Sequence, residues 1–181
     1  LITTCPNVSY NVLLKDGSET IVDNPSEMPV SNEIDKIFEP YIKAEIIVPK
    51  DYIGNIMSLC TKHRGKYLST TYLSIDRVQL VFEMPLAEII YDFFENLKSS
   101  SKGYASLDYE LIDNKPGQLI KLDIKVAGEI VDALSIIIHK DDSYSKGRLL
   151  CKRLKSEIDR HQFEVPIQAT IGQKVIARET V

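Results

Sequence analysis

Apolar positions between residues 41 and 111 follow two spacings, one typical of strands and one typical of helices. The apolar residues within 53–60 fall at i, i+3, i+4 and i+7, which predicts a helix with one apolar face. The same spacing predicts a second helix over 86–97, opened by Pro85. Strands are expected at 42–48, 66–73, 77–83 and 104–111. This β-α-β-β-α-β order predicts an α+β fold of the ferredoxin-like type, with two helices on one face of an antiparallel sheet.

The segment before this domain predicts a hairpin and a linker. Asp16-Gly17 separates two strand-like runs within residues 8–22, which is a strong hairpin signal. Residues 23–32 are dense in turn formers, and a short helical turn is expected over 33–38, ended by Pro40. Because a lone hairpin is marginally stable, we expect it to complete a domain whose body lies upstream.

A second α+β module is expected after a turn-rich boundary at 114–117. Its predicted elements are strands at 119–126 and 133–139, a helix at 142–159, and closing strands at 167–172 and 174–178. Some sixty residues are marginal for an independent core. We therefore expect this module to lean on its neighbour or to continue beyond residue 181, and we interpret the whole chain as a piece of a longer protein.

The charge balance excludes one class of function. The chain has 181 residues with 22 Lys and Arg against 26 Asp and Glu, so its net charge is −4 and it is not a uniformly basic nucleic-acid binder. No apolar run approaches the ~20 residues needed to cross a bilayer, and no signal peptide is visible. The three widely spaced cysteines are typical of reduced thiols.

Catalytic and metal-binding motifs are absent from the sequence. It contains no G-x-x-x-x-G-K-[ST], no G-x-G-x-x-G and no G-x-S-x-G. Cys60 and His63 have C-x-x-H spacing, but no second pair completes a zinc site, so we expect Cys60 to pack in the core. His139 and His161 have no nucleophile at a meaningful spacing. We expect neither catalysis nor a bound metal.

One stretch is strongly basic. Six cations lie between Lys146 and Arg160, against only two acids. Within it, Arg148, Lys152 and Lys155 follow i, i+4 and i+7 spacing, which places them on one helix face where they could contact several phosphates. A solvated helix face is the competing interpretation. The candidate RNA-binding residues here are Lys146, Arg148, Lys152, Arg153 and Lys155. A weaker cluster at a helix-to-strand turn adds Arg64 and Lys66.

Two sets of motifs carry a resemblance to a known family. Three motifs resemble the opening of domain V in translational GTPases related to elongation factor G. They are Glu39-Pro40-Tyr-Ile-Lys43, Pro49-x-x-Tyr52-x-Gly54-x-x-Met57 and Arg64-Gly65. A narrower resemblance to the LepA family, also called elongation factor 4, is carried by Gly103-Tyr-Ala-Ser-Leu-Asp-Tyr-Glu110, Val131-Asp-Ala-Leu134, Phe163-Glu-Val-Pro-Ile-Gln-Ala169 and Ile176-Ala-Arg-Glu-Thr180. Together these segments span nearly the whole chain.

The resemblance implies a domain map and a set of partners. Residues 1–24 would end a domain III, 25–38 would be a linker, 39–113 would be domain V, and 117–181 a truncated LepA-type C-terminal domain. The implied partners are the ribosome, ribosomal RNA and tRNA in the A-site region, with no small-molecule substrate for this part. The resemblance implies that the full-length protein hydrolyses GTP and uses Mg²⁺. It also implies a cytoplasmic location, with peripheral association with the inner face of the bacterial cell membrane. This chain alone is not expected to hydrolyse GTP, because the family's catalytic residues have no counterparts in it.

Two alternatives to this interpretation remain open. A different factor of the elongation factor G kind should lack the module after residue 114. A protein-docking module would instead use the acidic part before residue 117, which has 11 cations against 17 anions, rather than the part after it, with 11 against 9. Replacing the basic helix face with glutamates separates RNA contact from protein docking.

Overall fold

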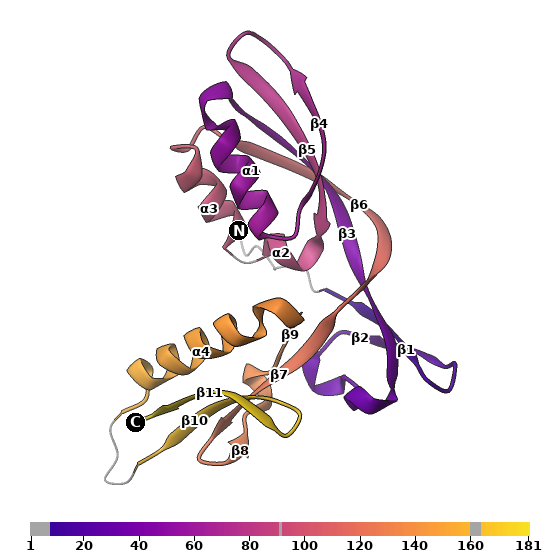
Figure 1. Cartoon of the computed structure of the whole chain (residues 1–181), viewed down its shortest axis with the longest axis vertical. Coiled ribbons are helices and arrows are strands. Elements are labelled where there is room, and N and C mark those ends of the chain that lie inside the picture. Colours follow the sequence, from indigo (N-terminus) through magenta and orange to yellow (C-terminus); the bar gives the residue numbers. More distant parts are fainter. Residues whose placement is uncertain (1–7, 91, 160–163) are drawn as a thin grey trace, which may run out of the picture. The chain divides into compact units, whose positions relative to one another are not determined.

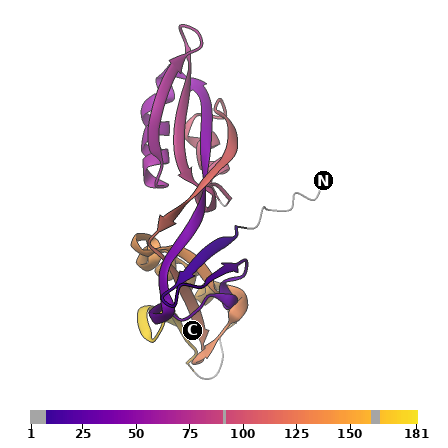
Figure 2. The same ribbon diagram turned by 90° about the vertical axis from the view of Figure 1, so that its right-hand side faces the viewer.

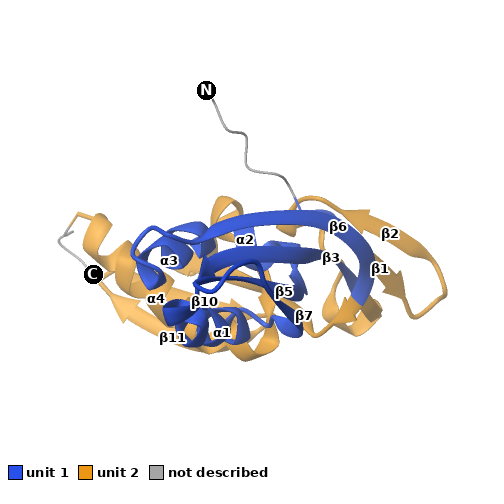
Figure 3. Ribbon diagram, turned by 90° about the horizontal axis from the view of Figure 1, so that it is seen from above, with its two compact units in different colours: residues 1–9, 38–115 blue, residues 10–37, 116–181 orange. Residues whose placement is uncertain are grey.

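The computed structural model describes residues 8–90, 92–159 and 164–181, and the chain divides into two compact units (Figure 3). Unit 1 comprises residues 1–9 and 38–115, and unit 2 comprises residues 10–37 and 116–181. The strands are β1 (Tyr10–Leu14), β2 (Glu19–Val22), β3 (Ile34–Pro49), β4 (Lys66–Tyr72), β5 (Arg77–Pro85), β6 (Ser106–Gly117), β7 (Leu119–Val126), β8 (Glu129–Ile130), β9 (Ile136–His139), β10 (Pro166–Ile171) and β11 (Lys174–Thr180). The α-helices are α1 (Ile53–Lys62), α2 (Leu86–Ile90), α3 (Phe93–Ser100) and α4 (Ser143–Glu157).

Unit 1 is a sheet in the order β6-β3-β5-β4, with helices on one face (Figure 1). β5 is antiparallel to both β3 and β4, with Ile46 opposite Leu80 in the first pair. The connectivity is β3-α1-β4-β5-α2-α3-β6, which is the ferredoxin-like order. The α+β fold class predicted from the apolar spacing is confirmed.

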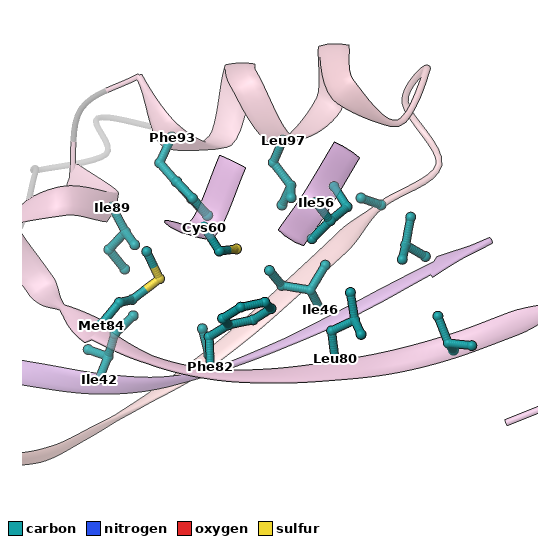
Figure 4. Packing of buried hydrophobic residues seen from close by; sticks show 14 of the residues in the cluster. Ile42, Ile46, Ile56, Cys60, Leu80, Phe82, Met84, Ile89, Phe93 and Leu97 are labelled. Carbon is teal, nitrogen blue, oxygen red and sulfur yellow. The ribbon is translucent and has the colours of Figure 1, made fainter. Parts of the chain in front are cut away.

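The core of unit 1 lies between the sheet and the helices (Figure 4). Alternate residues of β3 and β5 point toward the helices, because successive side chains in a strand face opposite sides. The helices close the layer from the other side with their apolar stripes. The fully or almost fully buried side chains labelled in Figure 4 are Ile42, Ile46, Ile56, Cys60, Leu80, Phe82, Met84, Ile89, Phe93 and Leu97. The prediction that Cys60 packs in the core is confirmed.

Two local predictions differ from the structure. The helical turn expected over 33–38 is wrong, because β3 begins at Ile34 after a one-turn 3₁₀ segment. Neighbouring strands provide backbone partners along its length, whereas one isolated helical turn gains little over its nucleation penalty. The helix expected over 86–97 consists of two helices, α2 and α3. Pro85 is the last residue of β5, and α2 begins directly after it, as expected. The apolar spacing persists because both helices face the same core.

Unit 2 contains a second antiparallel sheet in the order β11-β10-β7-β8, with β9 also paired to β7. β7 is its central strand: one edge pairs with β10, and the other pairs with β9 and then β8. The strand predicted at 119–126 is confirmed. The one expected at 133–139 is shorter, since β9 begins at Ile136 after a 3₁₀ turn. The β1–β2 hairpin around Asp16-Gly17 is also confirmed and belongs to this unit.

Helix α4 packs across β10 and β11 (Figure 1). Gly147 permits this close approach, because a Cβ there would lie 3.1 Å from the Ala169 Cβ and 3.2 Å from the Ile176 Cδ1. Cys151 of α4 packs there against the sheet in a second apolar core, whose other buried residues are Leu122, Ile124, Ile138, Ile167 and Ala169. Across the described residues, no helix is both long and apolar enough to span a bilayer.

Candidate nucleic-acid interface

The candidate basic residues of unit 2 project from α4. The helix turns Ser143, Gly147 and Cys151 inward, at i, i+4 and i+8, so these residues define its buried side. The side chains expected to contact RNA all lie elsewhere on the helix and are exposed: Lys146, Arg148, Lys152, Arg153 and Lys155. Arg160, which ends the same basic stretch, and His161 after it lie outside the described residues.

Helical geometry separates these cations into two flanks. Arg148, Lys152 and Lys155 lie on one side of the exposed surface, as their i, i+4, i+7 spacing predicts. Lys146 and Arg153, seven residues apart, lie on the other side. Leu149 lies between the flanks and is 67 % exposed. The sequence therefore predicted one stripe correctly but did not distinguish the second.

Ion pairing divides the same cations differently. The Arg153 Nε donates to the Glu157 Oε1 at 3.1 Å, and the Lys155 Nζ donates to the Glu179 Oε2 on β11 at 3.3 Å. Among residues 8–90, 92–159 and 164–181, no acidic partner pairs with Lys146, Arg148 or Lys152. Within the described part of the chain, these three charges are therefore the ones most available to an anionic ligand.

A hollow lies beside one end of this surface. It has a volume of about 500 Å³ and is lined by Lys152, Lys155 and Ser156 of α4 together with Thr180 and Val181. The ammonium of Lys152 and the hydroxyls of Ser156 and Thr180 at one concave place can bind an anionic oxygen group, whereas the Lys155 ammonium there is paired with Glu179. The hollow thus extends the basic flank of Arg148 toward the end of β11.

Arg64, the first residue of the weaker cluster, has a different environment. Its Nη1 donates to the Glu39 Oε1 at 2.7 Å, its Nη2 to the Glu39 Oε2 at 3.2 Å and its Nε to the Glu88 Oε1 at 2.9 Å. The Arg64 side chain is 20 % exposed and that of Glu39 is 0 % exposed. Its guanidinium binds two carboxylates of its own unit, so we leave Arg64 out of the proposed RNA interface.

The backbone conformation and the electrostatics of Arg64 also indicate that its guanidinium binds within unit 1. Arg64 has φ +59°, a left-handed conformation that ends α1 before Gly65. Burial alone lowers the pKa of the Arg64 guanidinium, but its hydrogen bonds and charge attraction to Glu39 and Glu88 outweigh burial and raise the pKa. His63 joins the cluster, with its Nδ1 3.1 Å from the Glu88 Oε2. We call these four residues the Arg64 cluster. Lys66, at the start of β4, remains exposed.

The open face of the unit 1 sheet carries mixed charge and one aromatic ring of β3, that of Tyr41, with the Lys115 Nζ 5.2 Å from its centroid. On this side β3 presents Lys43 and Glu45, and β5 presents Gln79 and Glu83. Gln79 donates to the Glu45 Oε2 at 3.2 Å. Sheets of this topology that bind single-stranded RNA use exposed aromatic rings on their central strands to stack bases. The acidic residues here do not fit that mode of binding.

Comparison with known proteins assigns the two parts of the chain. Residues 36–125 match the family model for the elongation factor G C-terminus, and residues 126–181 match that for the C-terminus of the GTP-binding protein LepA. The chain is 53 % identical over 181 residues to elongation factor 4 of Staphylococcus aureus strains JH1 and N315. The chain is similar over its whole length to the C-terminal part of LepA-type factors. It spans 30 % of the length of those relatives and corresponds to their C-terminal part.

The match to the LepA C-terminal model covers α4 and all five of its candidate cations. Its match to residues 126–181 favours a LepA-type factor over one of the elongation factor G kind. One solved structure, a crystal structure of a protein from Thermus thermophilus, is 20 % identical, with a TM-score of 0.42 over 45 % of this chain and 12 % of its own. That likeness is too weak to carry an argument.

Proposed function

We propose that this chain is the ribosome- and tRNA-contacting part of a LepA-type translation factor, with α4 as its RNA-binding element. The observation that carries the proposal is the group of exposed cations without an acidic partner among the described residues, Lys146, Arg148 and Lys152. The similarity to LepA-type factors supports the ribosome as partner. The whole factor would be a GTPase, using GTP and Mg²⁺, that acts in translation in the cytoplasm; this chain has no phosphate-binding loop motif and would supply contacts only.

The contacts proposed for α4 are electrostatic. A helix rises about 1.5 Å per residue, so four residues separate Arg148 from Lys152 by about 6 Å along the axis. Phosphate contacts position an RNA without reading its bases, and A-form RNA is recognised mainly by shape and backbone. We therefore propose that α4 lies against the sugar-phosphate backbone of ribosomal RNA or of tRNA in the A-site region.

The experiment titrates the 181-residue chain with deacylated tRNA and with 70S ribosomes at two salt concentrations. Three cations contacting three phosphates predict a slope of about −2 to −3 for log K against log salt. The double variant Arg148→Glu plus Lys152→Glu should abolish most of this binding and flatten the slope.

A matched control changes the same charge elsewhere in unit 2. Lys36 and Lys174 are both exposed and lie outside α4, so Lys36→Glu plus Lys174→Glu alters the net charge equally. The control should retain tight, salt-dependent binding. Equal losses of binding in both double variants would mean that only net charge matters. If neither the unmodified chain nor the control binds at low salt, α4 is rejected as an RNA-binding element.

A further inference from the structure

Helix α4 carries an exposed aromatic ring on the same side as Arg148 and Lys152. Tyr144 lies in the first turn of the helix, and Tyr144, Arg148 and Lys152 follow one another at i, i+4 and i+8. The three side chains therefore form one row along the helix surface. Tyr144 is 59 % exposed. The phosphate contacts proposed for α4 leave this ring without a role.

The ring of Tyr144 has no structural task in the described part of unit 2. It does not belong to the apolar core that α4 covers. Among the described residues, its hydroxyl makes no hydrogen bond, and no other ring or cation stacks on it. Because α4 lies against one face of the sheet, its outer side faces away from the sheet of its own unit (Figures 1 and 2). The ring is therefore accessible to a ligand.

The charges along α4 change in the order that a single nucleotide presents. Around the first turn they balance, since two lysines are opposed by two aspartates, Lys140 and Lys146 by Asp141 and Asp142. One turn farther, about 6 Å along the axis, the guanidinium of Arg148 has no acidic partner among the described residues. An uncharged ring is thus followed by an uncompensated cation. A nucleotide has the matching parts, an uncharged planar base and a charged phosphate.

This arrangement matches unpaired RNA better than a duplex or a protein. Aromatic rings and Arg guanidinium planes both stack on bases that are splayed out. Proteins that bind single strands combine such rings with a positively charged track for the backbone. Bases inside a duplex are already stacked on one another, and an acidic protein segment has no planar base to place on the ring. Tyr144 beside Arg148 therefore favours an unpaired nucleotide.

We propose that Tyr144 stacks on an unpaired base of the RNA that α4 binds, while Arg148 contacts the phosphate of the same nucleotide. This inference rests on the proposed function for RNA as the partner, and it adds the kind of nucleotide. The expected consequence is tighter binding to single-stranded RNA than to a duplex of equal length. Phosphate contacts alone would favour the duplex, because its charge density is higher.

Fluorescence reports on the stacking directly. The chain contains no tryptophan, so Tyr144→Trp introduces a single indole into the 181-residue chain. A short single-stranded RNA should quench this indole, and the same strand in a full duplex should not. The matched control is Tyr109→Trp, because Tyr109 is 40 % exposed on β6, outside α4, and its indole should respond to neither RNA. A position-144 indole that saturating single-stranded RNA leaves unquenched, or that the duplex quenches equally, would overturn the inference.

Affinity supplies a second readout. Tyr144→Ser should weaken binding of the single strand by about fivefold or more and leave duplex binding unchanged, whereas Tyr144→Phe keeps the ring and should bind like the unmodified chain. Serine, phenylalanine and tyrosine have similar helix propensities, so α4 should form in both variants. Unchanged single-strand affinity in Tyr144→Ser, or an equal loss on the duplex, would refute stacking. So would competition by poly-glutamate as strong as that by unlabelled RNA, since poly-glutamate has no base.

The outcomes separate this inference from the proposed function. Salt-dependent binding that is equal for single strand and duplex, and is lost in Arg148→Glu plus Lys152→Glu, would support the phosphate contacts and refute the stacked base. Quenching of the position-144 indole that persists when Arg148→Glu and Lys152→Glu are added would support the stacked base and refute phosphate binding by α4. An absence of RNA binding at low salt would refute both.

Discussion

The Arg64 cluster allows one prediction to be worked out in full. Arg64→Met removes the cation while keeping a side chain of similar length. Glu39 is 0 % exposed and the Glu88 side chain is 10 % exposed, so both carboxylates lose their principal partner inside unit 1. Removing one partner of a buried ion pair typically destabilises a protein by about 3–5 kcal/mol, because the remaining charge stays desolvated. That is a large fraction of a total stability of about 5–15 kcal/mol.

The assay is equilibrium unfolding in urea, followed by far-ultraviolet circular dichroism at neutral pH. Arg64→Met should lower the free energy of unfolding by the amount above. The triple variant Arg64→Met, Glu39→Gln, Glu88→Gln should recover most of the loss, because it removes the unpaired charges as well. Arg77→Met is the matched control: Arg77 is exposed on β5, and surface changes usually stay within about 0.5 kcal/mol.

Two outcomes would refute this reasoning. A loss below about 1 kcal/mol for Arg64→Met would mean that the cluster behaves like a solvated surface ion pair. A triple variant as unstable as the single variant would show that packing around the guanidinium, rather than uncompensated carboxylates, determines the effect. Either result would also reopen the question of whether Arg64 can turn outward toward an anionic ligand.

Two further predictions concern the cores. Burial raises the pKa of the Cys60 thiol to about 12, so in a chain whose other cysteines are serine it should resist thiol reagents until urea unfolds the protein. The unfolded thiol ionises near its ordinary pKa of 9.0 while the folded one stays protonated. The free energy of unfolding should therefore fall as pH rises from 9.0 to about 12, and this fall should be smaller in Cys60→Ser. Gly147→Ala should destabilise unit 2 by about 1–3 kcal/mol through its contacts with Ala169 and Ile176, measured by urea unfolding. Gly54→Ala in α1 is the control: a Cβ there meets nothing within 4 Å, so this change should stabilise unit 1 by about 0.5–1 kcal/mol. If Gly147→Ala stabilised unit 2 instead, that result would contradict the close approach of α4 to β10 and β11.

Most of the fold could be predicted from local periodicity, because each element needs only its own spacing of apolar residues. The segment at 33–38 could not, because its state depends on pairing with strands distant in the sequence. Its three apolar residues, Ile34, Ile37 and Phe38, have helical spacing, but a segment this short can equally form part of a strand. The neighbouring strands, rather than local preference, determined the outcome.

The candidate site shows the same division between local and distant information. The exposure of Arg148 and Lys152 follows from helical spacing, and the structure confirms that exposure. The fate of Arg64 does not, because its partners Glu39 and Glu88 are 25 and 24 residues away in the sequence. One signal was available in the sequence: Arg64 lies directly before Gly65 at the end of a predicted helix. The chain reverses direction at such a position, which can direct the side chain back toward its own domain.

The central position of β7 bears on how a lineage could gain or lose this module. The elongation factor G match extends to residue 125, so it includes nearly all of β7, yet β7 is the strand on which β8, β9 and β10 assemble. A recombination junction at residues 125 and 126 would give the recipient a helix and strands with no scaffold. Residues 126–181 therefore do not form a complete sheet by themselves. A chimera that keeps this module must also contain Leu119–Val126.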